Sequence, residues 1–220
     1  MGVARNFNKH ISNDVSTIDF TADLTDEEHL SQKHKKILFF LDRCFDCICD
    51  LGLEHAGSGA LARYCGTSSA NLFNNYFNDK DEIITHCCAR CMQKVEDDFM
   101  SRAPQNPAEI ENYIMTMPYI TAELHGKKYR AMYQIYSSPR YYGEGEKFFD
   151  GVTKRYTEYA MELAPKLGIP AETVQGLIFI FVRACVHYAM FENEEYLKSQ
   201  QQILISMIHA MTAHSSYPVK

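Results

Sequence analysis

Apolar residues at helical spacing are the feature that most constrains the fold of this 220-residue chain. From Lys33 onward they recur every three or four residues, which places them on one side of an α-helix. This stripe consists of Ile37, Phe40, Leu41, Cys44, Phe45, Ile48 and Leu51. Gly52 follows at once, and glycine is common just past the end of a helix. The pattern predicts a first helix over residues 33–51.

The rest of the chain also favours helices, since no segment alternates apolar and polar residues as a strand does. A long helix is expected over 79–100, with Asn78 as its N-cap and Asp81 at its third position. The segment APQNP at 103–107 breaks the helical pattern. Beyond it we expect helices over 108–117, 119–125, 127–137, 145–167, 171–191 and 194–213. The sequence therefore predicts an all-α fold.

Composition and charge narrow the class of protein. Hydrophobic residues make up 46% of the chain, which is enough for a real core, and the net charge of −6 does not suit a strongly basic nucleic-acid binder. No run of about eighteen apolar residues predicts a transmembrane helix, and the N-terminus has no apolar signal region. We expect a cytoplasmic protein without a membrane partner, whose eight cysteines are thiols.

The stretch LARYCGTSSANLFNNYF, residues 61–77, needs a separate explanation. It is too polar for a buried helix and too regular for a loop. Leu61 and Ala62 can face inward, Gly66 suits a turn, and Ser68 is a good N-cap for a second short helix. Two short helices joined by a tight turn that contains glycine match a helix-turn-helix.

Together with its flanks, this stretch resembles the TetR family of transcriptional regulators. The family's typical run is Ile-Ala-x-x-Ala-Gly-Val-Ser, then Leu-Tyr, then Tyr-Phe-x-x-Lys-Glu. The matching residues are Leu61, Ala62, Arg63, Tyr64, Cys65, Gly66, Thr67, Ser68, Leu72, Phe73, Tyr76, Phe77, Asn78, Asp79, Lys80 and Asp81. FNNYF is one residue longer than the usual Tyr-x-Tyr-Phe, and no Lys or Arg lies between Thr67 and Asp79. The resemblance is specific over about residues 35–85.

Residues 1–32 are polar and show no clear period, so we expect a flexible N-terminal extension there. The resemblance implies a DNA-binding domain (33–80) and a ligand-binding and dimerisation domain (81–220). It implies a homodimer that binds a palindromic double-stranded DNA operator and, as a repressor, is released by a small, largely apolar effector. An activator role stays open. The expected DNA-binding residues are Lys35, Arg63, Thr67, Ser68, Ser69, Asn71, Asn74, Asn75, Tyr76 and Lys80.

The chemistry of this region is compatible with DNA. Asparagine can pair bidentately with adenine, while serine and threonine can serve bases or phosphates. Residues 33–80 carry six Lys or Arg against five Asp or Glu, a local net charge of +1. Asp42, Asp46 and Asp50 recur every four residues, so they are expected to share one side of the first helix, away from the duplex.

The C-terminal part is expected to sense a ligand and to dimerise. By resemblance, helices 171–191 and 194–213 pair with their counterparts in a second subunit, although both could instead be monomer core. Met and aromatic side chains can line an adaptable apolar pocket. The expected pocket residues are Phe99, Tyr113, Met117, Tyr133, Tyr136, Tyr156, Phe179, Arg183 and His187. If buried, Arg183 would need a carboxylate or an anionic ligand as a partner.

Other classes of function have weaker support. Cys44 with Cys47, and Cys88 with Cys91, have a spacing that could face one metal ion or form a thiol-based redox sensor, but small core residues explain them as well. No catalytic order, phosphate loop or paired carboxylates point to an enzyme, and no cofactor is expected. The alternative is a small-molecule-binding or thiol- or metal-sensing helical protein with weak or lost DNA binding.

Overall fold

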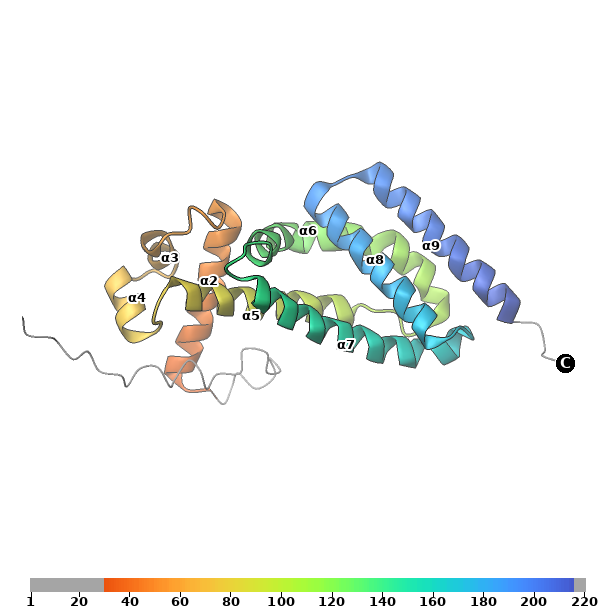
Figure 1. Cartoon of the computed structure of the whole chain (residues 1–220), viewed down its shortest axis with the longest axis horizontal. Coiled ribbons are helices and arrows are strands. Elements are labelled where there is room, and N and C mark those ends of the chain that lie inside the picture. Colours follow the sequence, from red (N-terminus) through yellow and green to blue (C-terminus); the bar gives the residue numbers. More distant parts are fainter. Residues whose placement is uncertain (1–29, 216–220) are drawn as a thin grey trace, which may run out of the picture. The chain divides into compact units, whose positions relative to one another are not determined.

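The computed structural model describes residues 30–215, and all regular structure in that part of the chain is helical (Figure 1). The all-α expectation is therefore confirmed. The chain divides into two compact units, one ending at Lys94 and the other beginning at Val95. The expected extension over residues 1–32 lies almost entirely outside the described residues. Helices are labelled as in Figure 1.

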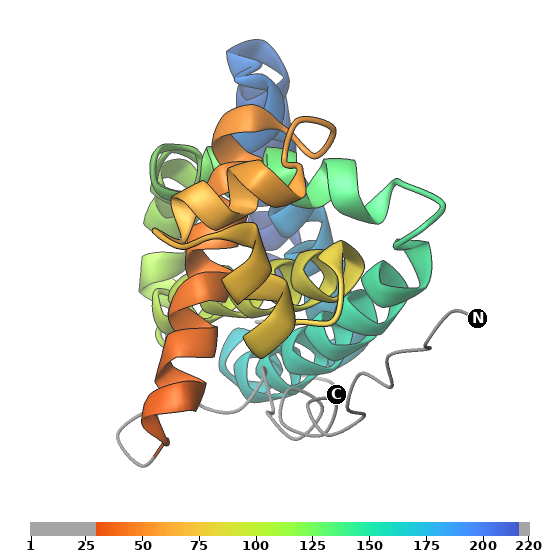
Figure 2. The ribbon, with the colours of Figure 1, turned by 90° about the vertical axis from the view of Figure 1, so that its left-hand side faces the viewer.

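Unit 1 consists of a long helix, two short helices and the first part of a second long helix. These elements are α2 (Gln32–Leu51), α3 (Ser58–Tyr64), α4 (Ser69–Asn75) and the start of α5 (Lys80–Ser101). Figure 2 shows α3 and α4 beside α2, against which α3 packs. The stripe expected on α2 is buried from Ile37 to Ile48. Ser31 caps α2 through the N–H of His34, and the helix ends at Leu51 with Gly52 directly after it, as expected.

The start of α5 differs by one residue from the sequence expectation. Asp79, and not Asn78, is the cap, because its carboxylate accepts the N–H of Glu82 at 2.9 Å. Glu82 in turn accepts the N–H of Asn78 at 2.5 Å. The two bonds resemble a capping box, except that Glu82 accepts from the residue before the cap and not from the cap itself.

Unit 2 is a helical bundle in which α8 packs against three other helices (Figure 1). Its elements are the end of α5, a short 3-10 turn (Pro107–Glu109), α6 (Ile110–Tyr136), α7 (Tyr142–Leu167), α8 (Ala171–Phe191) and α9 (Glu194–Ser215). The bounds of α8 are those expected from the sequence, whereas α7 begins three residues earlier than expected. The partners of α8 are α6, α7 and α9.

The three helices expected between 108 and 137 are wrong, because α6 is one continuous helix with Pro118 inside it. Proline lacks an N–H, so the carbonyl of Ile114, four residues earlier, loses its helical partner. The side chain of Gln201 on α9 donates to this carbonyl at 2.9 Å and to that of Met115 at 3.2 Å. The tertiary contact replaces the missing local bond, so the helix continues.

The break expected between the helices 119–125 and 127–137 is also absent, because Gly126 lies within α6. A Cβ at this position would come within 3.0 Å of the carbonyl oxygen of Ala189 on α8. The absence of a side chain therefore lets the two helices approach each other closely. The same carbonyl accepts a hydrogen bond from Arg130 at 3.0 Å.

Helix α8 is, among residues 30–215, the one helix long and apolar enough to cross a membrane by length and composition alone. The expectation that the chain has no transmembrane helix stays a prediction, because length and composition alone do not place a helix in a membrane. A core helix of a helical bundle meets the same criterion, and α8 packs against α6, α7 and α9. Part of the surface of α8 is nevertheless exposed, including the side chains of Ile180 and Phe191.

Candidate functional site

The turn between α3 and α4 fixes how α4 is presented. Gly66 has a φ of +64°, a conformation that favours glycine, and the N–H of Thr67 returns to the carbonyl of Ala62. Ser68 then caps α4 by accepting the N–H of Asn71 at 3.1 Å. Leu72 is fully buried and anchors the helix. The result is a short helix with one buried side and one polar, solvent-facing side.

Some polar side chains of α4 are already hydrogen-bonded within the protein, and others are not. Asn71 donates to Thr67 Oγ1 at 2.7 Å, and Asn75 donates to Asn71 Oδ1 at 2.7 Å. Asn71 must break these bonds before it can pair with a base. Asn74 is exposed, and its side chain makes no hydrogen bond within the described part of the chain. Asn74 is therefore the amide on α4 most ready to contact a ligand.

The remaining residues expected at this site have different surroundings. Ser69 is half-buried and donates weakly to the carbonyl of Ser58 at 3.4 Å. Arg63 is exposed, while Lys35 and Lys80 are half-buried. The ring of Tyr76 packs edge-on against Phe40 with centroids 4.9 Å apart, and the ammonium of Lys36 lies 5.5 Å from the same ring. Lys36 is thus a basic residue near α4 that was not expected from the sequence. It lies four residues before Phe40 on α2, so that contact is local, whereas its contact with Tyr76 depends on tertiary packing.

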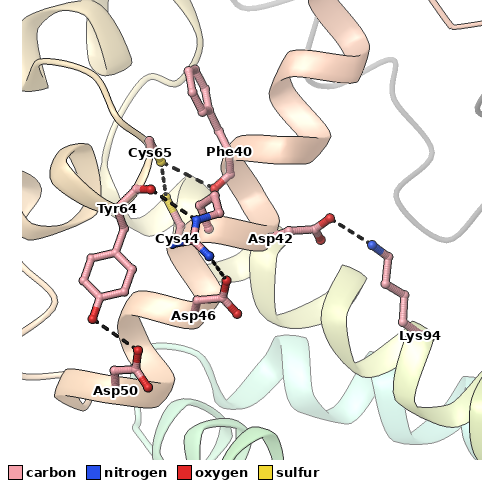
Figure 3. Close-up of polar contacts among 9 residues, drawn as sticks. Phe40, Asp42, Cys44, Asp46, Asp50, Tyr64, Cys65 and Lys94 are labelled. Atoms are coloured by element: carbon pink, nitrogen blue, oxygen red, sulfur yellow. Dashed lines mark hydrogen bonds and ion pairs between the residues drawn. The ribbon is translucent and has the colours of Figure 1, made fainter.

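The three carboxylates of α2 are each paired, so they do not form a free acidic surface (Figure 3). Asp42 binds Arg90 at 3.0 Å and Lys94 at 2.9 Å, and Asp46 binds Arg43 at 2.6 Å. Asp50 accepts the hydroxyl of Tyr64 at 3.2 Å. Cationic partners offset two of these charges, which reduces the negative field around α2 and α3.

Unit 2 contains an apolar cavity of about 60 Å³. Side chains from α5, α6, α7, α8 and α9 line it, and they are almost all aliphatic or aromatic. Three expected pocket residues contribute to it: Phe99, Tyr113 and Tyr156. Residues that the sequence argument missed include Ile110, Leu177, Phe181 and Leu204. Their only sequence signal is membership of an apolar stripe, which does not distinguish a cavity wall from packed core.

The other six expected pocket residues do not line this cavity, because four of them pack elsewhere and two are exposed. Met117 is buried on α6, Phe179 packs against the Tyr156 ring at 5.9 Å, and Tyr136 packs against Phe148 at 5.8 Å. Tyr133 is 57% exposed.

Arg183 and His187 also lie outside the cavity. Arg183 is exposed on α8, so its charge needs no buried partner. The ring of His187 lies 4.4 Å from that of Tyr196 and 4.9 Å from that of Phe191. Its Nδ1 is buried and has no hydrogen-bond partner among the described residues. The pairing of these two residues as a polar pocket wall is therefore not supported.

A buried carboxylate borders the cavity wall. Glu96 on α5 accepts the hydroxyl of Tyr156 at 2.5 Å, and both side chains are buried. Burial raises the pKa of Glu96 above its ordinary value. The hydrogen bond from Tyr156 lowers the same pKa, but by less. Burial and the nearby Glu96 charge raise the pKa of Tyr156, which stays protonated as a donor.

Metal binding by the cysteines gains no support from the geometry. Among residues 30–215, no three or more His, Cys, Asp or Glu side chains are grouped to hold a metal ion. All eight cysteines lie in this part of the chain, and none is linked in a disulfide. The Cys44/Cys47 and Cys88/Cys91 pairs therefore do not combine into one metal site.

Comparison with known proteins identifies no relative. No protein-family model, curated protein or solved structure matches the chain.

Proposed function

We propose that the chain is a dimeric DNA-binding transcriptional regulator in which α3 and α4 form a helix-turn-helix. The observation that carries the proposal is the presentation of α4. Leu72 anchors this helix, Gly66 sets its angle to α3, and Asn74 and Asn75 are exposed. A helix of this kind reads base edges in the major groove with its exposed polar side chains. The sequence resemblance to TetR regulators supports the same assignment.

Local charge supports DNA binding at modest strength. Arg63 and Lys36 are exposed, and Lys80 is partly exposed, so each can reach a phosphate. Each phosphate contact releases counterions and makes the affinity fall with salt. Few such contacts are available per subunit, so tight binding requires two subunits on two half-sites.

Exposed apolar side chains on α8 and α9 support dimerisation through these helices. Ile180 is 40% exposed and Phe191 62% exposed on α8, and Ile203 is 49% exposed on α9. Burying such side chains in an interface contributes roughly 25 cal/mol per Å² of apolar area. A dimer that binds two half-sites needs its two copies of α4 about one turn of DNA apart, ~34–36 Å.

The apolar cavity of unit 2 supports a small effector. Its volume of about 60 Å³ is well below the ~300–1,000 Å³ typical of sites for drug-sized ligands. A larger effector must displace side chains of the wall, and this displacement would shift the equilibrium between two conformations. In the proposed mechanism, an apolar effector that binds one conformation better lowers the affinity for DNA. Repression relieved in this way is the form of regulation we propose.

The test is a selection of genomic fragments with the purified chain, followed by fluorescence anisotropy on the selected duplex at several salt concentrations. We expect salt-dependent binding to a palindrome. Lys80→Glu should weaken binding to every sequence. If no selected duplex binds in a salt-dependent way, the proposal of a DNA-binding regulator is wrong.

The dimer has its own test, by light scattering after size-exclusion chromatography. Ile203→Lys should convert the dimer to a monomer. Met161→Lys is the matched control, since Met161 is an equally apolar and 62% exposed residue on α7, outside the proposed interface. A wild-type monomer at micromolar concentration, or equal effects of the two variants, would contradict the interface.

A second candidate function is a ligand-binding helical protein without DNA binding. The hydrogen bonds among Thr67, Asn71 and Asn75 favour it, because they satisfy these side chains without any nucleic acid. The absence of Lys and Arg on α4 favours it as well. Thermal stabilisation by apolar compounds, combined with no binding to any duplex, would identify this case.

A further inference from the structure

Two cysteines that are distant in sequence meet in unit 1. Cys44 lies in the middle of α2, and Cys65 is the C-terminal cap of α3, directly before Gly66 (Figure 3). Their Sγ atoms are 3.4 Å apart. The Sγ of Cys65 also lies 3.6 Å from the carbonyl oxygen of Phe40. A disulfide has a sulfur–sulfur distance of about 2.05 Å, so a small approach of the two side chains would allow one to form.

The two thiols are not equivalent. A hydrogen bond from Cys44 is the main cause that lowers the pKa of Cys65; burial opposes this effect and the Arg43 charge adds to it. The same hydrogen bond, together with burial, raises the pKa of Cys44. Cys44 is fully buried, whereas Cys65 keeps 5% of its surface exposed. Cys65 is thus the thiol that a small reagent meets first and the better nucleophile of the two.

We infer that Cys44 and Cys65 form a modification site, a dithiol that hydrogen peroxide oxidises to a disulfide joining α2 to the turn before α4. Cys65 sulfur attacks one peroxide oxygen, the O–O bond breaks, and Cys65 becomes a sulfenic acid as one water leaves. Cys44 sulfur then attacks the Cys65 sulfur, the S–O bond breaks, and a second water leaves. The two thiols supply the two electrons that reduce the peroxide.

The disulfide acts on the segment that positions α4. The turn at Gly66 connects Cys65 directly to the cap of α4 at Ser68. A covalent link from Cys65 to α2 restricts the opening of this turn, because it removes conformations in which α3 and α2 separate. The oxidised protein should therefore hold α4 more rigidly than the reduced protein does. This inference concerns the protein alone and goes beyond the proposed binding of DNA.

The first experiment maps the disulfide in the full-length protein. The reduced chain is treated with a slight excess of hydrogen peroxide, remaining thiols are alkylated, and the digest is analysed by mass spectrometry. We expect a peptide pair linking Cys44 to Cys65, with a loss of about 2 Da that a dithiol reductant reverses. A link between Cys47 and Cys65, a link elsewhere, or no link would overturn the inference.

Two variants and a second measurement sharpen the test. Cys44→Ser should trap a sulfenic acid on Cys65 that dimedone labels, whereas Cys47→Ser should leave the disulfide yield unchanged. If either variant fails to fold, the wild-type map still decides. In the oxidised wild-type chain, amide hydrogen exchange over 66–77 should be slower than in the reduced chain; unchanged exchange would overturn the clamping of α4. Neither readout uses DNA, so failure here is distinct from failure of the proposed function.

Discussion

The hydrogen bond from Gln201 to the Ile114 carbonyl provides the sharpest test of how α6 stays continuous through Pro118. Gln201→Met keeps the length of the side chain but removes the donor, so the carbonyl loses its replacement partner. In a Pro118→Ala background, the new Ala N–H can bond to Ile114 within the helix. We therefore expect Gln201→Met to lower the free energy of unfolding more in the wild-type background than in the Pro118→Ala background.

The size of this difference follows from the geometry. The bond is 2.9 Å long and Gln201 is 1% exposed, so water cannot easily take its place. A buried carbonyl left without a donor costs about 1–3 kcal/mol. The side-chain oxygen of Gln201 itself has no partner, but its removal affects both backgrounds equally and cancels in a double-mutant cycle. The expected coupling free energy is therefore about 1–2 kcal/mol.

The assay is urea unfolding followed by far-UV circular dichroism, since the chain has no tryptophan to report by fluorescence. The four proteins of the cycle are compared with a control, Gln202→Met, at an exposed position of the same helix. The control should change the free energy of unfolding by less than about 0.5 kcal/mol. Equal costs of Gln201→Met in the two backgrounds would refute the reasoning.

Three other predictions concern the buried carboxylate, the proposed DNA site and the cavity. The folded state binds a proton on Glu96 more tightly than the unfolded state does, because burial raises its pKa above 4.5. Stability should therefore fall as pH rises above 4.5 through the raised folded pKa, and Glu96→Gln should flatten this decline in unfolding titrations. On the selected operator, Asn74→Ala should reduce discrimination at one base pair by ~1–3 kcal/mol. Arg63→Glu should weaken binding to all sequences and lower the slope of log affinity against log salt concentration by about 1 or more. Phe181→Ala should destabilise unit 2 by about 3–5 kcal/mol and let a small aromatic compound raise its melting temperature.

Each of these predictions has a contrary outcome. An unchanged pH dependence in Glu96→Gln would mean that other groups control the stability in this range. A uniform loss of affinity in Asn74→Ala would mean that this residue contacts phosphate and not a base. No compound-induced stabilisation in Phe181→Ala would show that the enlarged space collapses.

The helices of this protein were largely predictable because their signals are local. The bonds of a helix join residues four apart, and its caps act within one turn, so a short window of sequence contains them. The stripe ending at Gly52 and the cap at Ser68 show this, since both elements occur where expected. The bounds of α8 follow in the same way from its apolar run after Pro170.

Other features depended on residues far apart in the chain. Pro118 predicts a helix end from local rules alone, yet α6 continues because Gln201 supplies the missing donor to Ile114, from which it is 87 residues distant in the chain. The same holds for Cys65, whose contact with Cys44 on α2 exists only after α3 has packed.

The cavity wall shows the same limit. Periodicity marks an aromatic residue as inward-facing, but it does not say whether the residue meets a cavity or another side chain. Tyr156 and Phe181 line the cavity, while Tyr136 fills a contact with Phe148. The sequence by itself therefore determined where the helices lie along the chain, because hydrogen bonds and caps within a helix are local. Only the tertiary structure decided which side chains meet between helices, because those contacts depend on how whole elements pack.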